Sequence, residues 1–431
     1  MIDDKLYSKK WTRWIVLFLR LAVGSVFVFS GFVKAIDPWG VLYKFQDYVA
    51  ALGCDWLSPF LLFGAFAVSI FEFVLGVCLI IGAYRRFSVW ASFLLMIVMT
   101  PLTLWLSITG AVSDCGCFGE AITLSNTATF IKNVVLLIAV TYLLRYNVRV
   151  MNIYSSSIQW IVTLLTIAYV TAIALYGYFY QPMIDFRPYK VGTSVMPAVT
   201  DEQTEADFTF IYEKDGVQKE FSIDDIPEED TSWVFVERKE SISGNAEMMI
   251  NSSGLVITED GEEVSNDVIR TEGEQIILVF SDMEDIDISY TYLINMIDDF
   301  ARQQDADIIG LAAASQESVD EWNDLSMATY PIYTAEDTEL KILARGNPAV
   351  VYMNDGKIVW KRTLQSISAA RVDKAINGEG GFSWVAEDYD GGTRLNFMTL
   401  SYLAVMIMIL IANRSYRVYK FSARLIKKNQ K

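Results

Sequence analysis

Two cysteines separated by a single glycine are the sharpest chemical feature of this sequence. Cys115 and Cys117 follow Asp114 in a short polar segment between two long apolar runs. Thiols at this spacing can form a redox-active disulfide, a static disulfide or a pair of unbonded structural thiols. A zinc site needs four nitrogen or sulfur ligands. The chain has no histidine, and only Cys54 is a further thiol expected at the same membrane face, so we predict no metal site.

The remaining two cysteines have different expected surroundings. Cys54 lies just before an apolar run, at the membrane face where Cys115 and Cys117 are also expected. Three thiols at one face allow one disulfide and one attacking thiolate, which is the minimum for internal exchange. We therefore predict that Cys54 is the resolving thiol of the pair, whereas Cys78, inside the apolar run, is a small buried side chain.

Charged side chains also occur inside the apolar runs. Arg20 and Glu72 differ in expected depth by only ~6 Å, and an unpaired charge at the bilayer centre costs on the order of 3 kcal/mol. We predict that they form an intramembrane ion pair, either purely structural or lining a quinone or proton site, so quinone is a candidate cofactor.

Lys132 lies near the outer end of the fourth run and has two possible roles. It either faces Asp114 or Glu120 and favours a thiolate in the cysteine pair, or it extends to the membrane–water boundary.

The elements that must position these residues are helices that cross a membrane. A helix needs about 20 mostly apolar residues to cross roughly 30 Å of hydrocarbon. Six runs approach or reach this length, at residues 14–33, 57–82, 87–109, 127–144, 158–180 and 397–412. The chain is 53% hydrophobic yet has a net charge of −17, because its acidic residues gather between residues 185 and 395. An integral membrane protein with an acidic domain outside the bilayer accounts for both values.

Lysines and arginines in the short connections set the expected orientation. They occur before the first run, between the second and third, between the fourth and fifth, and after the sixth. We predict a bacterial inner-membrane protein with both termini cytoplasmic and with residues 35–56, residues 110–126 and the acidic domain outside. The acidity excludes a nucleic-acid partner, because phosphate binding requires clustered Lys and Arg. The absence of histidine excludes an imidazole as general base or haem ligand.

The acidic domain has two parts with different patterns. Residues 207–240 alternate as strands around an Asp215-Gly216 turn, which predicts a hairpin. Residues 274–377 predict the order strand, helix, strand, helix, followed by a hairpin around residues 354–356. This order is typical of an α/β domain.

The segment at residues 345–356 resembles the second half of a thioredoxin fold, in which a cis-proline opens a strand that leads through a short turn to an edge strand. The resemblance covers residues 274–377 and assigns Pro348 as the cis-proline; an ordinary turn proline is the alternative. The Cys-x-x-Cys motif of that family would fall near residues 285–288, where no cysteine occurs. The resemblance therefore implies a thioredoxin-like domain that cannot exchange disulfides.

The first half of the chain resembles the MauE branch of the DoxX-like membrane family. The resemblance rests on RLAVG at residues 20–24, SGFVK at residues 30–34, Asp37-Pro38 and DCGCFG at residues 114–119, and it spans residues 12–145. It implies a role in methylamine-dehydrogenase maturation, together with a thioredoxin-like partner, in forming disulfides outside the membrane.

These observations support two hypotheses of different classes. The first is a DoxX/MauE-type inner-membrane protein that assists periplasmic thiol–disulfide chemistry or protein maturation, with the lipid bilayer and a periplasmic or membrane protein as partners. The second is a non-catalytic membrane scaffold whose redox-silent thioredoxin-like domain binds a partner protein. The DoxX resemblance adds a third, a small subunit of a quinol-oxidising complex.

The predicted fold is a membrane α-helical bundle, with a DoxX-like four-helix core plus two further transmembrane helices, and a periplasmic α/β thioredoxin-like domain. Its segments are a membrane domain with five transmembrane helices (residues 1–184), a β-rich connecting region (185–273), the thioredoxin-like domain (274–377), a linker (378–395), the sixth transmembrane helix (396–413) and a basic cytoplasmic tail (414–431).

Overall fold

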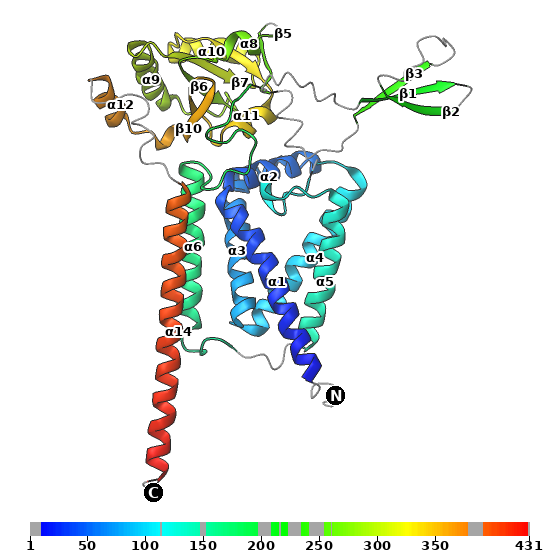
Figure 1. Ribbon diagram of the computed structural model, residues 1–431, viewed down its shortest axis with the longest axis vertical. Coiled ribbons are helices and arrows are strands. Elements are labelled where there is room, and N and C mark those ends of the chain that lie inside the picture. Colours follow the sequence, from blue (N-terminus) through cyan, green and yellow to red (C-terminus); the bar gives the residue numbers. More distant parts are fainter. Residues whose placement is uncertain are drawn as a thin grey trace.

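A computed structural model describes the protein over residues 10–112, 114–146, 152–196, 208–214, 217–222, 234–240, 254–259, 261–377 and 391–429 (Figure 1). Long helices stand side by side, and an α/β domain lies across one end of them. The start of α1 (Lys10–Ile36) and the end of α14 (Gly391–Asn429) both lie at the opposite end. Most of the predicted linker, residues 378–390, falls outside the described residues.

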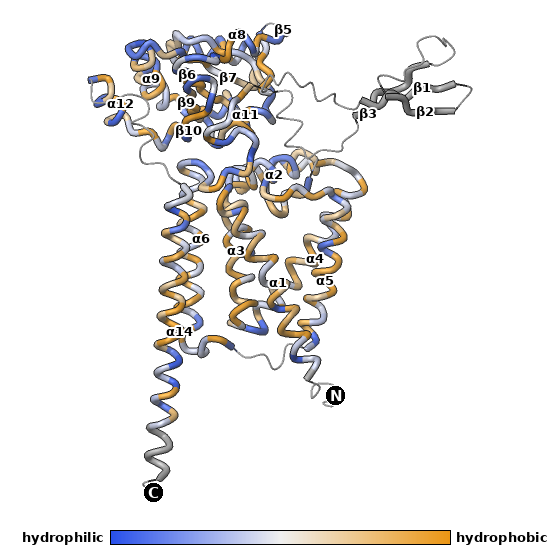
Figure 2. The backbone as a smooth tube through the Cα atoms, in the orientation of Figure 1, coloured by the Kyte–Doolittle hydropathy of each residue, from blue (hydrophilic) through white to orange (hydrophobic). Residues whose placement is uncertain are grey.

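Six helices of the described chain are long and apolar enough to cross a membrane, as the sequence predicts. Figure 2 shows hydrophobic residues along the length of these helices. Besides α1 and α14, the candidate spans belong to η2 (Asp55–Phe60) joined to α3 (Leu61–Ile81), α4 (Arg85–Thr109), α5 (Asn126–Tyr146) and α6 (Gln159–Phe179). The chain is therefore a multi-pass membrane protein.

The spans form a group of four and a pair. α1, α3, α4 and α5 share an apolar core that includes Val23, Leu79, Met96 and Val140. α6 and α14 pack against each other beside this group, where the ring of Tyr169 stacks on that of Tyr402 at 4.3 Å between centroids. The arrangement agrees with the predicted bundle of four helices plus two.

α2 (Pro38–Leu52) is a helix in a segment that the sequence analysis treats as an outer loop. It lies across the ends of the spans, on the side of the α/β domain (Figure 1). Pro38 occupies its first turn, the Asp37 carboxylate accepts a hydrogen bond from the Gly40 amide at 3.0 Å, and Gly53 ends it with a φ of 64°. These start and stop signals define a helix, although its 15 residues are too few to cross a bilayer.

The last helix is longer than its apolar run. α14 continues to Asn429, so the predicted basic tail is helical as far as the structure describes it. Neither glycine nor proline occurs between residue 393 and the end of this helix, so nothing in the sequence terminates it after the apolar run.

The α/β domain is built on seven strands in the order β10-β9-β6-β7-β8-β4-β5. β6 pairs parallel with β7 and β7 with β8, whereas β9 runs antiparallel to β6 and turns back into β10. The strands are β4 (Ile257–Glu259), β5 (Glu262–Glu263), β6 (Glu274–Phe280), β7 (Asp307–Ala312), β8 (Ile332–Ala335), β9 (Ala349–Asn354) and β10 (Lys357–Thr363). The α/β arrangement is confirmed, and the Asn347–Pro348 peptide bond that precedes β9 is cis.

Helices cover both faces of this sheet. One apolar core lies between the sheet and α9 (Thr291–Gln303), α10 (Gln316–Ser326) and α12 (Ala369–Ile376). A second lies between the sheet and α8 (Ser265–Val268) and α11 (Asp337–Leu343). The sequence analysis missed β8 and α11, because a four-residue strand with three partly or fully exposed side chains and a seven-residue helix show little periodicity.

A smaller antiparallel sheet precedes this domain in the chain. Its strands are β1 (Phe208–Lys214), β2 (Val217–Ser222) and β3 (Val234–Glu240), in the order β2-β1-β3. The predicted pairing of the first two strands is confirmed, while the turn residues 215 and 216 lie outside the described residues.

Glycines bring α1 and α3 into backbone contact. A Cβ atom on Gly76 would lie 2.5 Å from the Val28 amide nitrogen and 2.7 Å from the Gly24 carbonyl oxygen. A Cβ atom on Gly31 would lie 2.3 Å from the Phe73 amide nitrogen. These distances are too short for any side chain, so the two helices can keep this crossing only with glycine there.

We expect Gly76→Ala to force α1 and α3 apart and to destabilise the bundle by about 1–3 kcal/mol, the usual cost of overpacking. The matched control is Gly64→Ala in the same helix, where the new Cβ would meet only the Phe45 ring at 3.3 Å. Thermal unfolding of the detergent-purified full chain should show a lower midpoint for Gly76→Ala than for Gly64→Ala. Equal midpoints would contradict a backbone contact at Gly76.

Candidate functional site

The thiol pair lies in the connection between α4 and α5, at the end of the bundle that faces the α/β domain. The sulfurs of Cys115 and Cys117 are 2.9 Å apart, both thiols are free, and their residues are 6% and 8% exposed. Gly116 between them has a φ of +62°, a conformation that favours glycine. A Cβ atom on Gly116 would also lie 3.0 Å from the Lys44 side chain, so a larger residue would disturb the loop.

Side chains of α2 hold the thiol loop from one side. Lys44 forms an ion pair with Asp114 at 2.5 Å, and the other carboxylate oxygen of Asp114 accepts a hydrogen bond from the Gly116 amide at 2.9 Å. The Tyr48 hydroxyl donates to the Cys115 carbonyl oxygen at 2.6 Å. α2 therefore fixes the backbone on both sides of the first cysteine.

Buried polar residues of α1 and α3 contact the thiol loop from within the bundle. The Ser30 hydroxyl oxygen lies 2.7 Å from the Cys117 carbonyl oxygen and 2.7 Å from a carboxylate oxygen of Glu72. Lys34 donates to both carboxylate oxygens of Glu72, at 2.8 and 2.7 Å. An ion pair buried at the top of the bundle is thus connected to the second cysteine through one hydroxyl group.

The predicted pairing of Arg20 with Glu72 is wrong. Arg20 donates instead to the Leu79 carbonyl oxygen, from Nε at 3.0 Å and from Nη2 at 2.8 Å. The glycine contacts set Glu72 level with Ser30, roughly 15 Å along α1 from Arg20 at 1.5 Å per residue. The last carbonyls of α3 lack intrahelical partners, and the guanidinium of Arg20 binds there.

The two thiols have opposite affinities for a proton. The hydrogen bond from the Cys115 thiol lowers the pKa of Cys117 to about 6 against the effect of burial, and the charges of Lys132 and Lys34 lower it further. The same hydrogen bond and burial raise the pKa of Cys115 well above its usual value. These shifts favour the thiolate at Cys117 over the thiolate at Cys115.

Lys132 and Cys54 do not make the contacts that the sequence analysis expects. The Lys132 ammonium lies 4.2 Å from the centroid of the Phe118 ring, and neither Asp114 nor Glu120 is its ion-pair partner in the described residues. Its positive charge nevertheless acts on Cys117. Cys54 directly precedes η2, its thiol donates to the Leu52 carbonyl oxygen at 3.6 Å, and the structure does not bring it into the pair. Its role as resolving thiol thus has no geometric support.

A buried arginine of the α/β domain connects that domain to the thiol loop. Arg345 donates to both carboxylate oxygens of Asp37, at 2.7 to 3.1 Å, and lies 3.4 Å from a carboxylate oxygen of Glu120. Its backbone amide and carbonyl are both bound by the side chain of Gln181. Burial alone would lower the pKa of Arg345, but the charge and hydrogen bonds of Asp37 raise it above its usual range. Sequence reasoning missed this link because Asp37 and Arg345 lie 308 positions apart.

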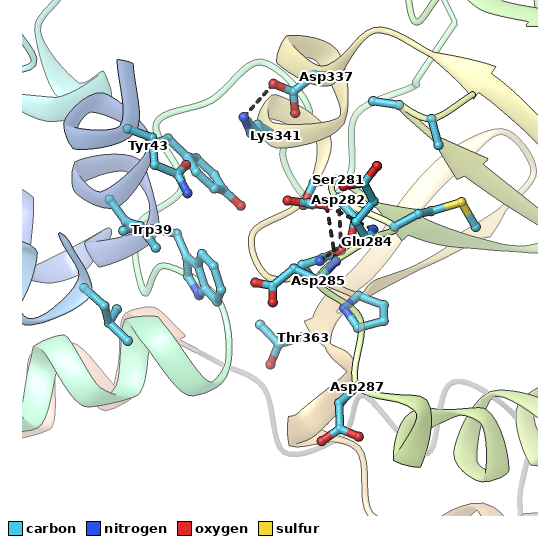
Figure 3. Close-up of a pocket in the computed structure, with 18 of the residues that line it drawn as sticks. Trp39, Tyr43, Ser281, Asp282, Glu284, Asp285, Asp287, Asp337, Lys341 and Thr363 are labelled. Atoms are coloured by element: carbon cyan, nitrogen blue, oxygen red, sulfur yellow. Dashed lines mark hydrogen bonds and ion pairs between the residues drawn. The ribbon is translucent and has the colours of Figure 1, made fainter. Parts of the chain in front are cut away.

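Beside this link, a cavity of about 740 Å³ separates α2 from the α/β domain (Figure 3). Trp39 and Tyr43 of α2 face it from one side, and Asp282, Asp285 and the segment around Pro348 face it from the other. The segment after β6, where the sequence analysis places the missing Cys-x-x-Cys, thus lies at this cavity and carries carboxylates instead of thiols.

The fold and this site define a class of protein: a multi-pass membrane protein with a thiol pair at one end of a four-helix group and a separate α/β domain against that end. Residues 12–146 match the model of a family described as methylamine utilisation protein MauE, so this part of the chain is MauE-like. Residues 206–243 match a model described as a domain of unknown function, DUF8463. No curated protein and no solved structure matches the chain.

The corrected ion pair can be tested with a double-mutant cycle. Lys34→Met or Glu72→Met alone leaves one uncompensated buried charge, and we expect each to destabilise the protein by about 3–5 kcal/mol. The double variant should lose less than the sum of the two. The control cycle combines Arg20→Met with Glu72→Met, and the two losses of stability should add. Non-additive losses in this control cycle, together with additive losses for Lys34→Met and Glu72→Met, would restore the predicted pairing of Arg20 with Glu72.

A second test concerns the Cys117 thiolate. Because only the thiolate is alkylated, we expect the iodoacetamide reaction of reduced Cys117 to rise with a midpoint near pH 6 and to slow below it. Lys132→Met removes a positive charge, and so it should move the midpoint to higher pH. Mass mapping of alkylated peptides measures Cys117 and Cys54 in the same sample, which controls for effects of pH on the reagent. A Cys117 midpoint at pH 8 or above would contradict the assignment.

Proposed function

We propose that this MauE-like membrane protein exchanges disulfides with a partner protein, and that Cys115 and Cys117 are the exchanging residues. The observation that carries the proposal is a pair of free sulfurs 2.9 Å apart. The hydrogen bond between them lowers the pKa of Cys117 and raises the pKa of Cys115, which favours Cys117 as the attacking thiolate. Exchange requires an attacking thiolate and a second thiol within reach of the first sulfur, and the pair provides both.

In this exchange the bonds, electrons and protons balance between the two proteins and the solvent. The Cys117 thiolate attacks a partner disulfide, forms a mixed disulfide and releases the other partner sulfur as a thiolate. Cys115 then loses its proton and attacks the Cys117 sulfur, which closes the Cys115–Cys117 disulfide and releases the second partner thiolate. The partner gains two electrons and takes up two protons, one from Cys115 and one from solvent. The same steps in reverse oxidise a partner dithiol.

The loop contacts explain why a protein is a more suitable substrate than a small thiol. Both sulfurs are buried, and Lys44, Tyr48 and Ser30 hold the loop in place. Attack therefore requires a displacement of the loop, for which a docked partner can compensate with contacts of its own. The description of the matched family, methylamine utilisation protein, is consistent with a role in that process.

The orientation belongs to the same proposal. Lys and Arg gather at the end of the spans away from the α/β domain, including Arg85 and Arg86 at the start of α4, Arg145 at the end of α5 and Arg414 and Arg417 in α14. Positive charge of this kind marks the cytoplasmic side, which directs the thiol loop and the α/β domain to the periplasm of a bacterial inner membrane. That compartment is oxidising and allows disulfides to persist.

A second candidate function is a scaffold that binds a partner protein without redox chemistry. The observation that favours it is the cavity between α2 and the α/β domain, since its walls combine aromatic rings with carboxylates around Pro348. The α/β domain contains no cysteine, so in this alternative it acts by recognition alone.

Trapping the mixed disulfide separates the two candidates. Cys115→Ser removes the resolving thiol but keeps Cys117, so we expect a partner adduct that reductant releases and that accumulates several-fold over the unmodified chain. Cys117→Ser should give no adduct, and Cys54→Ser should behave as the unmodified chain. Affinity purification from alkylated membranes and non-reducing electrophoresis measure the adduct. A partner that co-purifies equally with all variants, without any adduct, would support the scaffold instead.

A further inference from the structure

A second candidate site lies at the far end of the molecule from the thiol pair. A groove of about 1270 Å³ runs between the extended part of α14, the connection from α5 to α6 and the start of α4. In Figure 1 this is the end of the helices opposite the α/β domain, near the point where α14 passes beyond the other spans. Nothing in the proposed thiol chemistry involves these residues.

The lining of the groove is suited to an anion. Arg85, Arg414, Arg417 and Lys420 line it, together with serine hydroxyls at residues 155–157, and no carboxylate side chain is among its lining residues in the described chain. Four cations around one depression repel one another, and a bound anion relieves that repulsion. Guanidinium groups also match the geometry of phosphate oxygens.

A buried amide side chain and a half-buried one in the same lining add a second, independent observation. Asn413 is 7% exposed, and its oxygen accepts a hydrogen bond from the Ser155 hydroxyl at 2.7 Å, which fixes the orientation of the amide. Its nitrogen has no hydrogen-bond partner in the described residues, and neither has the side-chain oxygen of Asn152. The site therefore offers one unmet donor and one unmet acceptor. A phosphate oxygen can meet the first and a ligand hydroxyl the second.

The level of the groove in the bilayer identifies the source of such a ligand. The spans at Arg85–Thr109 and Gln159–Phe179 both begin at this level, so the groove lies at the boundary between hydrocarbon and water. Phospholipid phosphates occupy that boundary. Ile409 and Phe421 add apolar surface to the same groove, where acyl chains can pack.

We propose that this groove binds the headgroup of an anionic phospholipid that carries a free hydroxyl, such as phosphatidylglycerol. The basic residues here do more than set the orientation of the chain. Arg86, which adjoins Arg85 in sequence, is exposed and does not line the groove. It therefore serves as a matched control for charge.

Native mass spectrometry of the purified full chain in detergent tests the proposal with added phosphatidylglycerol or phosphatidylcholine. We expect adducts of phosphatidylglycerol on the unmodified chain and on Arg86→Gln. Arg417→Gln should bind about five-fold more weakly, and Arg414→Gln with Arg417→Gln about 25-fold, since each surface charge contributes a factor of about five. Arg417→Lys should recover most of the binding.

Three results would overturn the proposal. They are an equal loss with Arg86→Gln, equal binding of phosphatidylcholine, and displacement of the lipid by about 10 mM inorganic phosphate, which would identify a site for free phosphate. Because the substituted arginines are exposed, the variants should unfold at the same temperature as the unmodified chain in the absence of lipid. A lowered temperature for Arg417→Gln together with unchanged lipid binding would assign that side chain to stability and would also contradict the proposal.

Discussion

The close crossing of α1 and α3 is the constraint on which the rest of the site depends. Backbone contact at Gly31 and Gly76 fixes the register of the two helices, and this register places Glu72 opposite Ser30 and Lys34. A buried ion pair is stable only when its geometry satisfies both partners. The Ser30 hydroxyl extends that pair to the Cys117 carbonyl oxygen, so helix packing in the bundle determines where the second cysteine lies.

α2 contacts the thiol loop on its other side. Its Lys44 and Tyr48 hold the segment around Cys115, while Asp37 at its start binds Arg345 of the α/β domain. A single helix of 15 residues therefore contacts the thiol loop and the outer domain together. Arg345 also contacts Glu120, three residues after Cys117, so a displacement of the α/β domain acts on the loop through charge as well as through packing.

The sequence predicts the large elements of this fold well and its long-range contacts poorly. Six apolar runs and the α/β order could be recognised because burial imposes periodicity and composition that extend over many residues. α2 was missed although Pro38 and Gly53 mark its ends, because an outer loop was the simplest interpretation of a segment between two spans. The pairing of Arg20 with Glu72 failed for a different reason. Depth counted from the end of an apolar run cannot reveal the crossing register that the glycines impose.

For the site, the residue types were more predictable than their partners. The spacing of Cys115 and Cys117 identified the pair, and the charge of Lys132 does act on it. Lys44, Tyr48 and Arg345 could not be assigned, since each reaches the loop from a segment that is distant in sequence. Cys54 was included because it shares a membrane face with the pair, and a shared face is a weaker condition than contact.

The cysteines are confined to the membrane half of the molecule. All four lie between residues 54 and 117, so any thiol chemistry belongs to the membrane part. The α/β domain nevertheless turns the segment after β6 and the segment around Pro348 toward α2, at the cavity between that helix and the domain (Figure 3). Its carboxylates there create a negative potential at the cavity. Because Arg345 binds Asp37 at the start of α2 and also lies against Glu120 of the thiol loop, one buried side chain couples the position of this domain to the position of that loop.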